Sequence, residues 1–422
     1  PYWNNWFKNF ILKINNNPSY VIKISNPSES KNILILQDYI LDNLNKRTLI
    51  KNYIPKKIHS SIKLYQDQLD RFCFVRILDF IEGKIFAKIK SNSQLENSLG
   101  LMLGNLSKEL QNLNHPYAFR KFEWNPSDIN WIKKHINLFK GKKKEIILKN
   151  LSQYNLFVKN NKKNLRYSLT HGDANNYNLV VKNNLIVGLL DYGDIVYAPT
   201  INDLAISIAY ILMNKDNLYL SLKNIILSYN NNFPITTDEI FSLMTLVKSR
   251  LTITVVMAQK QRNKFPNNKY LSISENDAWN LLYKLNSINP YFFIFLIRDM
   301  CGYRINNNYE ETINYLNNKT FSNILDDDLK KIDKSIIKFN NKSIFSINYH
   351  SNPKLIAKNI DLFLKKNDSK IGIGLYKEIR NVYKGKNYVS LLNPKIRRNI
   401  HLGIDIFAPS GSSIRAPHDG KV

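Results

Sequence analysis

Three polar side chains suited to phosphate chemistry lie close together in this sequence. The His171-Gly172-Asp173 motif is followed by Asn178, five residues after the aspartate, and by Asp191, eighteen residues after it. Mg²⁺ prefers oxygen ligands in near-octahedral geometry and takes few of them from protein, which the Asp191 carboxylate and the Asn178 amide could supply. Asp173 could orient an acceptor hydroxyl and take its proton. The set predicts magnesium-dependent phosphoryl transfer with Asp173 as the base.

Short apolar runs place these residues at the ends of strands. Residues 166–170 run into the motif as one strand, and residues 178–181 and 185–190 form a hairpin around a turn at 182–184. The competing explanation is ordinary turn chemistry, because Gly, Asp and Asn are common in loops. The order, the spacing and the strand context together favour a functional site.

The motif and its surroundings resemble the catalytic and metal loops of the aminoglycoside phosphotransferase and choline kinase superfamily, closest to its hydroxylysine kinase-like branch. The resemblance extends from about residue 20 to about residue 310. The segments that carry it are residues 171–178, 190–194, 20–27, 202–205, 266–274 and 298–302.

This resemblance implies an α+β, two-lobed protein-kinase-like fold, with a small β-rich lobe and a larger, mostly helical lobe. It implies ATP or GTP as the phosphate donor and a small amino alcohol as the acceptor, similar to hydroxylysine, ethanolamine or an aminoglycoside. Lys23 would contact the nucleotide phosphates. Residues 20–24 support a strand around Lys23 independently, although a lysine on an edge strand would give the same pattern.

Two features depart from the family pattern. The chain opens at Pro1, about twenty residues before Lys23. We therefore expect the first two strands of the small lobe, and the phosphate-covering turn between them, to be absent or incomplete. We interpret the chain as a fragment that could be inactive. The helix expected at residues 28–44 should supply an acid to pair with Lys23. Its nearest polar candidates are Gln37 and Asp38, which leaves the partner of Lys23 open.

Three further polar residues near the motif have structural interpretations. Asp203 begins an apolar stretch and is expected to be a helix N-cap, and the resemblance implies that an acid there also steadies the catalytic loop. His171 is expected to fix the loop through backbone hydrogen bonds rather than to transfer protons. Asp194 is either a second metal contact or a turn residue.

The region after the metal loop is expected to be helical, at residues 218–230, 237–261, 275–286 and 291–301. In the superfamily this region forms the acceptor pocket. Three residues within it could meet a substrate carboxylate or could equally pair inside the fold. They are Arg250, Tyr270 and Arg298.

The sequence divides into four expected regions. Residues 1–83 form the small nucleotide-binding lobe, and residues 84–305 form the large catalytic and substrate lobe. Residues 306–354 are Asn-rich and charged, and read as a linker with one or two helices around residues 324–337. Glycine and β-branched residues then mark a second domain at 355–422.

His401 and Asp405 stand four residues apart in an alternating apolar setting, which suits two ligands of a tetrahedral zinc ion on one strand face. With residues 408–411 and 416–422 they resemble the opening half of a lysostaphin-like zinc endopeptidase, a partial all-β domain. The third ligand would lie beyond Val422, so we expect an incomplete Zn²⁺ site. The resemblance to the hydroxylysine kinase-like branch, in which such domains are fused in this order, implies a downstream pyridoxal-phosphate aminotransferase-like domain. The alternative function is a zinc peptidase-like or peptide-binding module, with the kinase-like part as its scaffold.

The composition favours a cytoplasmic protein. The chain has 422 residues and a formal net charge of +28, with 61 Lys and Arg against 33 Asp and Glu. These charges are spread along the chain without a long tract, so we interpret them as the compositional bias of an AT-rich genome rather than as a nucleic-acid site. Only Cys73 and Cys301 are cysteines, which argues against a disulfide framework. The most apolar runs, at residues 251–258 and 291–297, are shorter than the ~18 residues that a membrane span needs.

Overall fold

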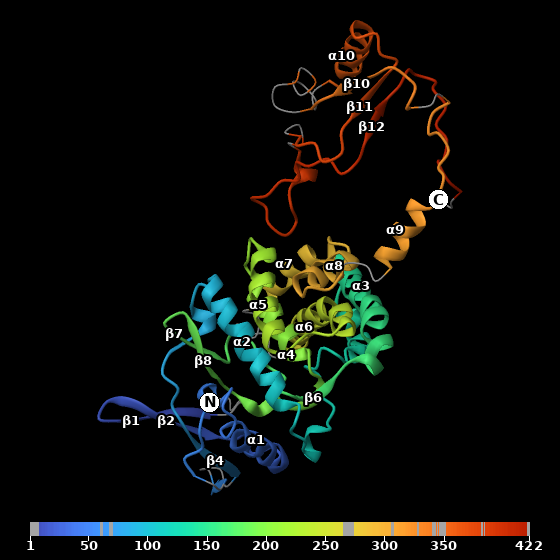
Figure 1. Cartoon of the computed structure of the whole chain (residues 1–422). Coiled ribbons are helices and arrows are strands. Elements are labelled where there is room, and N and C mark those ends of the chain that lie inside the picture. Colours follow the sequence, from blue (N-terminus) through green and yellow to red (C-terminus); the bar gives the residue numbers. More distant parts are fainter. Residues whose placement is uncertain are drawn as a thin grey trace. The chain divides into compact units, whose positions relative to one another are not determined.

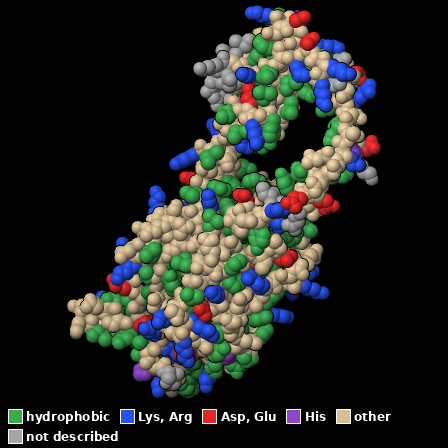
Figure 2. Space-filling view, in the orientation of Figure 1, with side chains coloured by type: hydrophobic (Ala, Val, Ile, Leu, Met, Phe, Trp, Pro, Cys, Tyr) green, Lys and Arg blue, Asp and Glu red, His purple; other side chains and the backbone are tan. Residues whose placement is uncertain are grey.

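The computed structural model describes residues 8–419 apart from residues 60–61, 67–70, 265–273, 305–307, 327–328, 340–342, 344, 346–351, 381–382 and 384. The chain divides into two compact units, Pro1–Asn306 and Asn307–Val422. The first runs from blue to orange in Figure 1, and the second from orange to red. Figure 2 shows Lys and Arg side chains scattered over the visible face rather than gathered into one patch.

A four-stranded antiparallel sheet opens the first unit. Its order is β1-β2-β4-β3, and these strands span Lys8–Ile14, Asn17–Ile24, Phe72–Asp79 and Lys63–Gln66. Strand β2 pairs with β1 on one side and with β4 on the other, so Lys23 lies on an interior strand. This position excludes the edge-strand explanation for Lys23. Among the described residues, one strand, β1, precedes the strand of Lys23. The sequence predicted that the two strands before Lys23 would be absent or incomplete.

Helix α1 (Lys31–Leu44) follows the strand of Lys23, within the expected range. It buries Leu34, Ile40 and Leu44 at helical spacing. Helix α1 also contacts the 3-10 helix η6 (Tyr192–Asp194), directly after Asp191. The helix therefore links the sheet of Lys23 to the loop of the expected metal ligand.

The strands around the predicted motif form as expected. Strand β7 (Leu179–Lys182) pairs with β8 (Leu185–Leu189), and the turn residues Asn183 and Asn184 have φ values of 53° and 58°. Positive φ at both central positions is the type I′ geometry of a two-residue hairpin, which asparagine tolerates. The remaining strands are β5 (Lys84–Ile85), paired with β7, and β6 (Tyr167–Thr170), paired with β9 (Val196–Pro199).

The rest of the first unit is mainly helical, and the region after the metal loop is helical as the periodicity predicted. Its helices are α2 (Ser93–Leu110), α3 (Gly141–Phe157), α4 (Asn202–Ile211), α5 (Leu218–Asn232), α6 (Thr237–Lys264), α7 (Glu275–Asn286) and α8 (Pro290–Met300). Short 3-10 helices join them: η1 (Lys51–Tyr53), η2 (Phe86–Lys88), η3 (Pro116–Ala118), η4 (Asn130–Leu138) and η5 (Lys159–Asn164).

Helix α6 is the central element of this helical part. It contacts α3, α4, α7 and α8 (Figure 1). By length and composition, Thr237–Arg262 could cross a membrane. This was not expected from the sequence, where only the apolar runs at 251–258 and 291–297 were considered. However, 94% of the apolar window in Thr237–Arg262 is buried inside the protein. Its burial is that of a core helix. No disulfide joins Cys73 and Cys301.

The second unit is mixed α and β, which corrects the expected all-β domain. Its elements are α9 (Tyr309–Asn317), β10 (Lys334–Ile337), α10 (Pro353–Lys366), β11 (Ile371–Gly374), η8 (Lys386–Tyr388) and β12 (Asp405–Phe407). Strand β10 replaces part of the helix expected around residues 324–337. It pairs in parallel with β11, and α10 supplies the crossover that a parallel pair needs. The core includes Ile337, Phe339, Phe345, Ile356, Ile360 and Leu364.

Candidate active site

The catalytic loop after β6 is held by a buried carboxylate. Asp203 accepts the backbone N–H groups of His171 and Gly172 at 2.8 and 2.9 Å. Burial raises the pKa of Asp203 to about 6, although both hydrogen bonds favour the ionised form. Helix α4 has Ile201 at its N-cap, so Asp203 lies inside the first turn. The expected N-cap role is wrong, and the carboxylate fixes the loop instead.

His171 joins the two functional loops without titrating near neutral pH. Its Nε2 donates to the carbonyl of Leu190 at 3.0 Å, and its Nδ1 accepts from the backbone N–H of Asp173 at 3.3 Å. Burial lowers the pKa of His171 to about 4. A neutral ring protonated on Nε2 satisfies both contacts. The geometry is that of the structural role expected for this histidine.

Gly172 lets the catalytic loop pass close to the metal loop. Its φ is +79°, and a Cβ at this position would lie 2.2 Å from the carbonyl oxygen of Asp194. Only glycine fits both the left-handed backbone and this close approach. The contact brings Asp173 next to η6.

The Asp173 carboxylate is oriented by three neighbours. Asn175 Nδ2 donates to both oxygens at 2.9 Å, Asn178 Nδ2 donates to Oδ2 at 2.9 Å, and Arg250 Nη2 forms an ion pair with Oδ1. Burial raises the pKa of Asp173 from its ordinary value, and the positive charge of Arg250 opposes this. The side chain keeps 20% exposure. It is an oriented, partly desolvated carboxylate.

Asn178 turns its oxygen away from Asp173. Its Nδ2 donates to the carbonyl oxygen and to Oδ2 of Asp173, both at 2.9 Å. Because the amide nitrogen makes both bonds, Oδ1 is left as the acceptor atom of this side chain. That is the atom with metal-ligand character.

Asp191 adopts a strained backbone at the start of η6. Its φ of 61° and ψ of 83° are left-handed, a conformation that costs energy in a residue other than glycine and that clusters at functional sites. Its Oδ1 lies 3.1 Å from Lys23 Nζ, and its side chain is 49% exposed. Burial opposes ionisation, but the Lys23 ammonium prevails and holds the pKa of Asp191 below its ordinary value. The carboxylate is therefore ionised and reachable.

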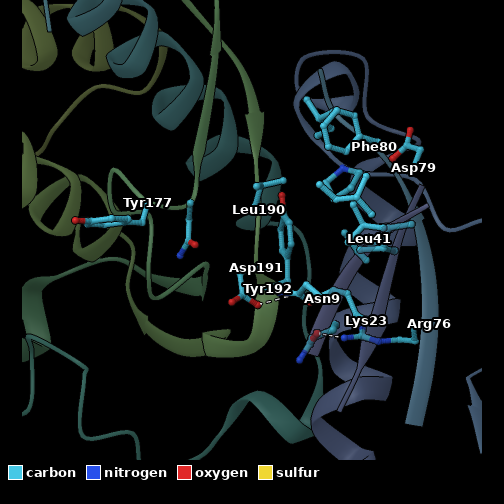
Figure 3. Close-up of a pocket in the computed structure, with 17 residues that line it drawn as sticks. Asn9, Lys23, Leu41, Arg76, Asp79, Phe80, Tyr177, Leu190, Asp191 and Tyr192 are labelled. Carbon is cyan, nitrogen blue, oxygen red and sulfur yellow. Dashed lines mark hydrogen bonds and ion pairs between the residues drawn. The ribbon is translucent and has the colours of Figure 1, made fainter. Parts of the chain in front are cut away.

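A cavity of about 320 Å³ has Lys23, Asn178 and Asp191 in its lining, and we name it the Lys23 cavity. Figure 3 shows Asp191 pointing across it toward Lys23. Its polar lining includes the Asp191 carboxylate and the Asn178 amide together with the cations Lys23 and Arg76. These groups fit a hard divalent cation together with phosphates. The apolar lining includes Val21, Leu41, Leu78, Phe80, Ile81 and Leu190.

The expected partners of Lys23 on α1 lie elsewhere. Gln37 Oε1 and Asp38 Oδ1 accept from the guanidinium of Arg76, at 2.6 and 3.3 Å. The acid beside Lys23 is Asp191, which comes from the metal loop. Sequence reasoning missed Arg76, although an arginine in the middle of the apolar strand Phe72–Asp79 was a visible signal.

Two of the three residues that could meet a substrate carboxylate pair inside the fold, which is one of the two alternatives that the sequence left open. Arg250 is 2% exposed and donates to the Trp124 carbonyl at 3.0 Å as well as pairing with Asp173. Arg298 donates to the Arg304 carbonyl at 2.8 Å. Tyr270 lies outside the described residues.

Asp194 adds a third acidic group near the loops. Burial, together with the charges of Asp173 and Asp191, raises its pKa to about 7. The described residues contain no cluster of three or more His, Cys, Asp or Glu placed to hold a metal ion. A metal held by Asn178 and Asp191 would need water and phosphate oxygens to complete its shell.

A second cavity, of about 360 Å³, lies on another side of the catalytic loop. Tyr177 lines both cavities. Lys215 in its wall is 3.0 Å from Glu96, and Asp277 accepts from Asn214 Nδ2 at 2.6 Å. We name it the Lys215 cavity; its polar lining includes Lys90, Ser91, Asn176, Tyr210, Asn214, Ser274 and Asp277.

The predicted zinc ligands come together but do not form a zinc site. His401 Nε2 lies 3.4 Å from Asp405 Oδ1, while Arg380 Nη2 lies 2.6 Å from Asp405 Oδ2. Arg380 is 3% exposed and is also paired with Glu378 at 2.8 Å. A buried guanidinium thus neutralises the carboxylate, and the described residues offer no third ligand. This donor set does not fit Zn²⁺, which needs at least three protein ligands.

The phosphotransferase enzyme family model matches residues 5–221. Hydroxylysine kinase of Mus musculus is 25% identical over 292 residues, covering 63% of this chain and 76% of the relative. The Xenopus laevis protein is 26% identical over 231 residues, covering 51% and 62%.

Two solved kinases share the fold. An amicoumacin kinase, in complex with AMP-PNP, Ca²⁺ and Ami, has a TM-score of 0.50 at 13% identity and covers 67% of this chain and 89% of its own. A microcompartment-associated aminopropanol kinase has a TM-score of 0.50 at 12% identity and covers 71% and 95%. With the family match and the curated relatives, the chain belongs to the phosphotransferase enzyme family and is a small-molecule kinase.

Proposed function

We propose that this kinase transfers the γ-phosphate of ATP or GTP to the hydroxyl of a small amino alcohol. Asp173 acts as the base, Lys23 contacts the phosphates, and Asn178 with Asp191 holds Mg²⁺. The observation that carries the proposal is the convergence of Lys23, Asn178 and Asp191 on one cavity with a large apolar lining. A cavity with charged groups and an apolar lining suits a nucleotide, because its phosphates are charged and its base is flat and largely apolar.

The chain's own residues would position the reactants. Asp173, held by Asn175, Asn178 and Arg250, would accept the hydroxyl proton in a fixed direction. Lys23 would move its ammonium from Asp191 to the phosphates when nucleotide binds, which frees the carboxylate for the cation. A bound Mg²⁺ would neutralise the charge on the phosphates.

The lining of the Lys215 cavity favours an acceptor that carries both a carboxylate and an ammonium group. Lys90 and Lys215 could attract a carboxylate, while Asp277 could receive an ammonium group. The Tyr210 hydroxyl lies 3.5 Å from Arg250 Nη2, which in turn contacts Asp173, so the wall of the cavity connects to the base. Relatives named hydroxylysine kinase and a neighbour named aminopropanol kinase agree with an amino alcohol.

A substrate panel tests the proposal. The full chain is incubated with Mg²⁺, with ATP or GTP, and with ethanolamine, aminopropanol, hydroxylysine or an aminoglycoside, and the phosphorylated product is followed by phosphorus NMR. Transfer to at least one amino alcohol is expected.

The variant Asp173→Asn should lose transfer while it keeps nucleotide affinity, because an amide cannot accept the proton. Unchanged turnover in this variant would remove Asp173 from the mechanism.

For the second unit we propose an accessory domain of peptidase-like descent, supported by the sequence resemblance at His401 and Asp405 but without a zinc site. The pyridoxal-phosphate aminotransferase-like domain stays a prediction. We propose the cytoplasm as the location, because the sequence has only two cysteines and no disulfide joins them.

A further inference from the structure

Two cations share the polar end of the Lys23 cavity. Lys23 and Arg76 are direct partners in the register between β2 and β4, so their side chains leave the same face of the sheet. Both line the cavity, and the Arg76 side chain is only 5% exposed. Figure 3 shows the two side chains next to each other. A buried guanidinium needs its hydrogen-bonding partners fixed, and α1 supplies them.

The contact with Arg76 determines how the Gln37 amide is turned. Arg76 Nη2 lies 2.6 Å from the end of the Gln37 side chain. A guanidinium only donates hydrogen bonds, so the atom facing it must be the oxygen, Oε1. The remaining terminal atom of Gln37 is therefore the Nε2 donor, and the usual ambiguity between amide oxygen and nitrogen does not arise here.

The Gln37 Nε2 donor has no hydrogen-bond partner within the part of the chain that the structure describes. The residue is 2% exposed and lines the Lys23 cavity. A Cβ on Gly193 would lie 3.7 Å from Gln37 Nε2 and 3.6 Å from Asp191 Oδ1, which places the donor and the carboxylate near one point. A buried donor without an acceptor is costly, so we expect an acceptor from outside the described residues.

We propose that Gln37, oriented by Arg76, donates a hydrogen bond from Nε2 to a phosphate oxygen of the bound nucleotide. This inference rests on the proposed function. The Gln37 amide adds a neutral donor beside the cations Lys23 and Arg76. The helix α1 thus contributes a phosphate contact, and Arg76 acts as its positioning residue.

The variant Gln37→Glu tests the contact directly. It keeps an oxygen for Arg76, removes the donor and adds a negative charge, so the fold is preserved while the phosphate contact is lost. Dissociation constants are measured for the nucleoside and its mono-, di- and triphosphate, in the adenosine or guanosine series that wild type prefers. We expect unchanged nucleoside affinity and a triphosphate affinity weakened by at least about tenfold, as for a lost hydrogen bond to a charged group.

Two further variants separate the possible causes. Gln37→Met removes the donor without adding charge and should weaken triphosphate binding less than Gln37→Glu does, again with nucleoside binding unchanged. Gln94→Glu makes the same chemical change at an exposed position in the first turn of α2, where an acid is tolerated, and should change neither affinity.

The outcomes distinguish this inference from the function on which it rests. Equal weakening for the nucleoside and the triphosphate in Gln37→Glu would mean that Gln37 only supports the fold. Unchanged triphosphate affinity would mean that Nε2 does not reach a phosphate. Either result overturns the inference and leaves the kinase assignment intact, provided that wild type binds nucleotide. A wild-type chain that binds no nucleotide would overturn both proposals.

Discussion

The Lys23–Asp191 and Arg380–Asp405 pairs both place a carboxylate against a cation, but their cations are held differently. Lys23 and Asp191 both line a cavity of about 320 Å³, and the Asp191 side chain is 49% exposed. The Asp405 side chain is 33% exposed, but its partner Arg380 is 3% exposed, is also bound by Glu378, and lies over the Phe339 ring at 4.9 Å. The first pair lines a space that can admit a ligand, whereas the second is tied to Glu378 and Phe339 through its arginine. Similar ion pairs therefore serve different purposes according to their surroundings.

Replacing Asp191 gives the largest expected effect. Asp191→Ala removes one of the two proposed metal ligands and should lower kcat on the order of 10²–10³-fold, as for loss of one preorganised charge contact. Steady-state kinetics with saturating Mg²⁺ measures it. Asp405→Ala is the matched control, because it breaks the other pair, and its kcat should equal that of wild type. Equal losses in the two variants would remove the distinction between the pairs.

The two buried arginines should be equally important for stability and unequally important for activity. Arg250→Met and Arg380→Met each leave a partly buried carboxylate without its cation, and each should destabilise its own unit by about 3–5 kcal/mol. Denaturant unfolding measures this. Only Arg250→Met should also lower kcat/KM, because Arg250 holds Asp173.

The pH dependence of kcat/KM in Arg250→Lys separates a change in the base from a loss of stability. A lysine keeps the charge but loses the planar contact, so the pKa of Asp173 should rise and the acid limb of kcat/KM should move to higher pH. An unchanged acid limb would contradict the proposed orientation of the base.

Local sequence patterns predicted most helices and the motif hairpin well. The stripe of α1 and the turn at Asn183 and Asn184 follow from residue spacing alone, because helical and hairpin periodicities are local. The four-residue strand β10 was predicted as helix. Its conformation depends on parallel pairing with β11, across α10, and no short window contains that information.

Pairings between distant residues were also beyond the sequence. Lys23 meets Asp191 across 168 positions, and the helix between them offered Gln37 and Asp38 as more obvious partners. Both instead accept hydrogen bonds from Arg76, which is the direct cross-strand neighbour of Lys23. Likewise, the spacing of His401 and Asp405 predicted their proximity, but it could not reveal that Arg380 already supplied the cation.

The raised pKa of Asp194, which reflects burial and the nearby charges of Asp173 and Asp191, can be tested through the pH dependence of stability. Its folded-state pKa of about 7 lies above its ordinary value of 3.8, so the folded protein keeps a proton that the unfolded chain releases between these values. The free energy of unfolding should therefore fall as pH rises through this window. Asp194→Asn cannot titrate, so it should be more stable than wild type at pH about 8 and show no gain at pH about 3.5. A gain that is equal at both values would contradict the shifted pKa.

Zinc should give the smallest effect, because Arg380 already neutralises Asp405 in the second unit. Adding equimolar Zn²⁺, or a chelator selective for zinc, should leave thermal unfolding of the full chain unchanged, since two candidate ligands bind the ion weakly and one is occupied. The variant Arg380→Met sharpens the test, because it removes the competing cation while it keeps His401 and Asp405. Stabilisation of wild type by zinc that disappears in His401→Ala would show that the pair can exchange its guanidinium for a metal, and would make the two ion pairs alike after all.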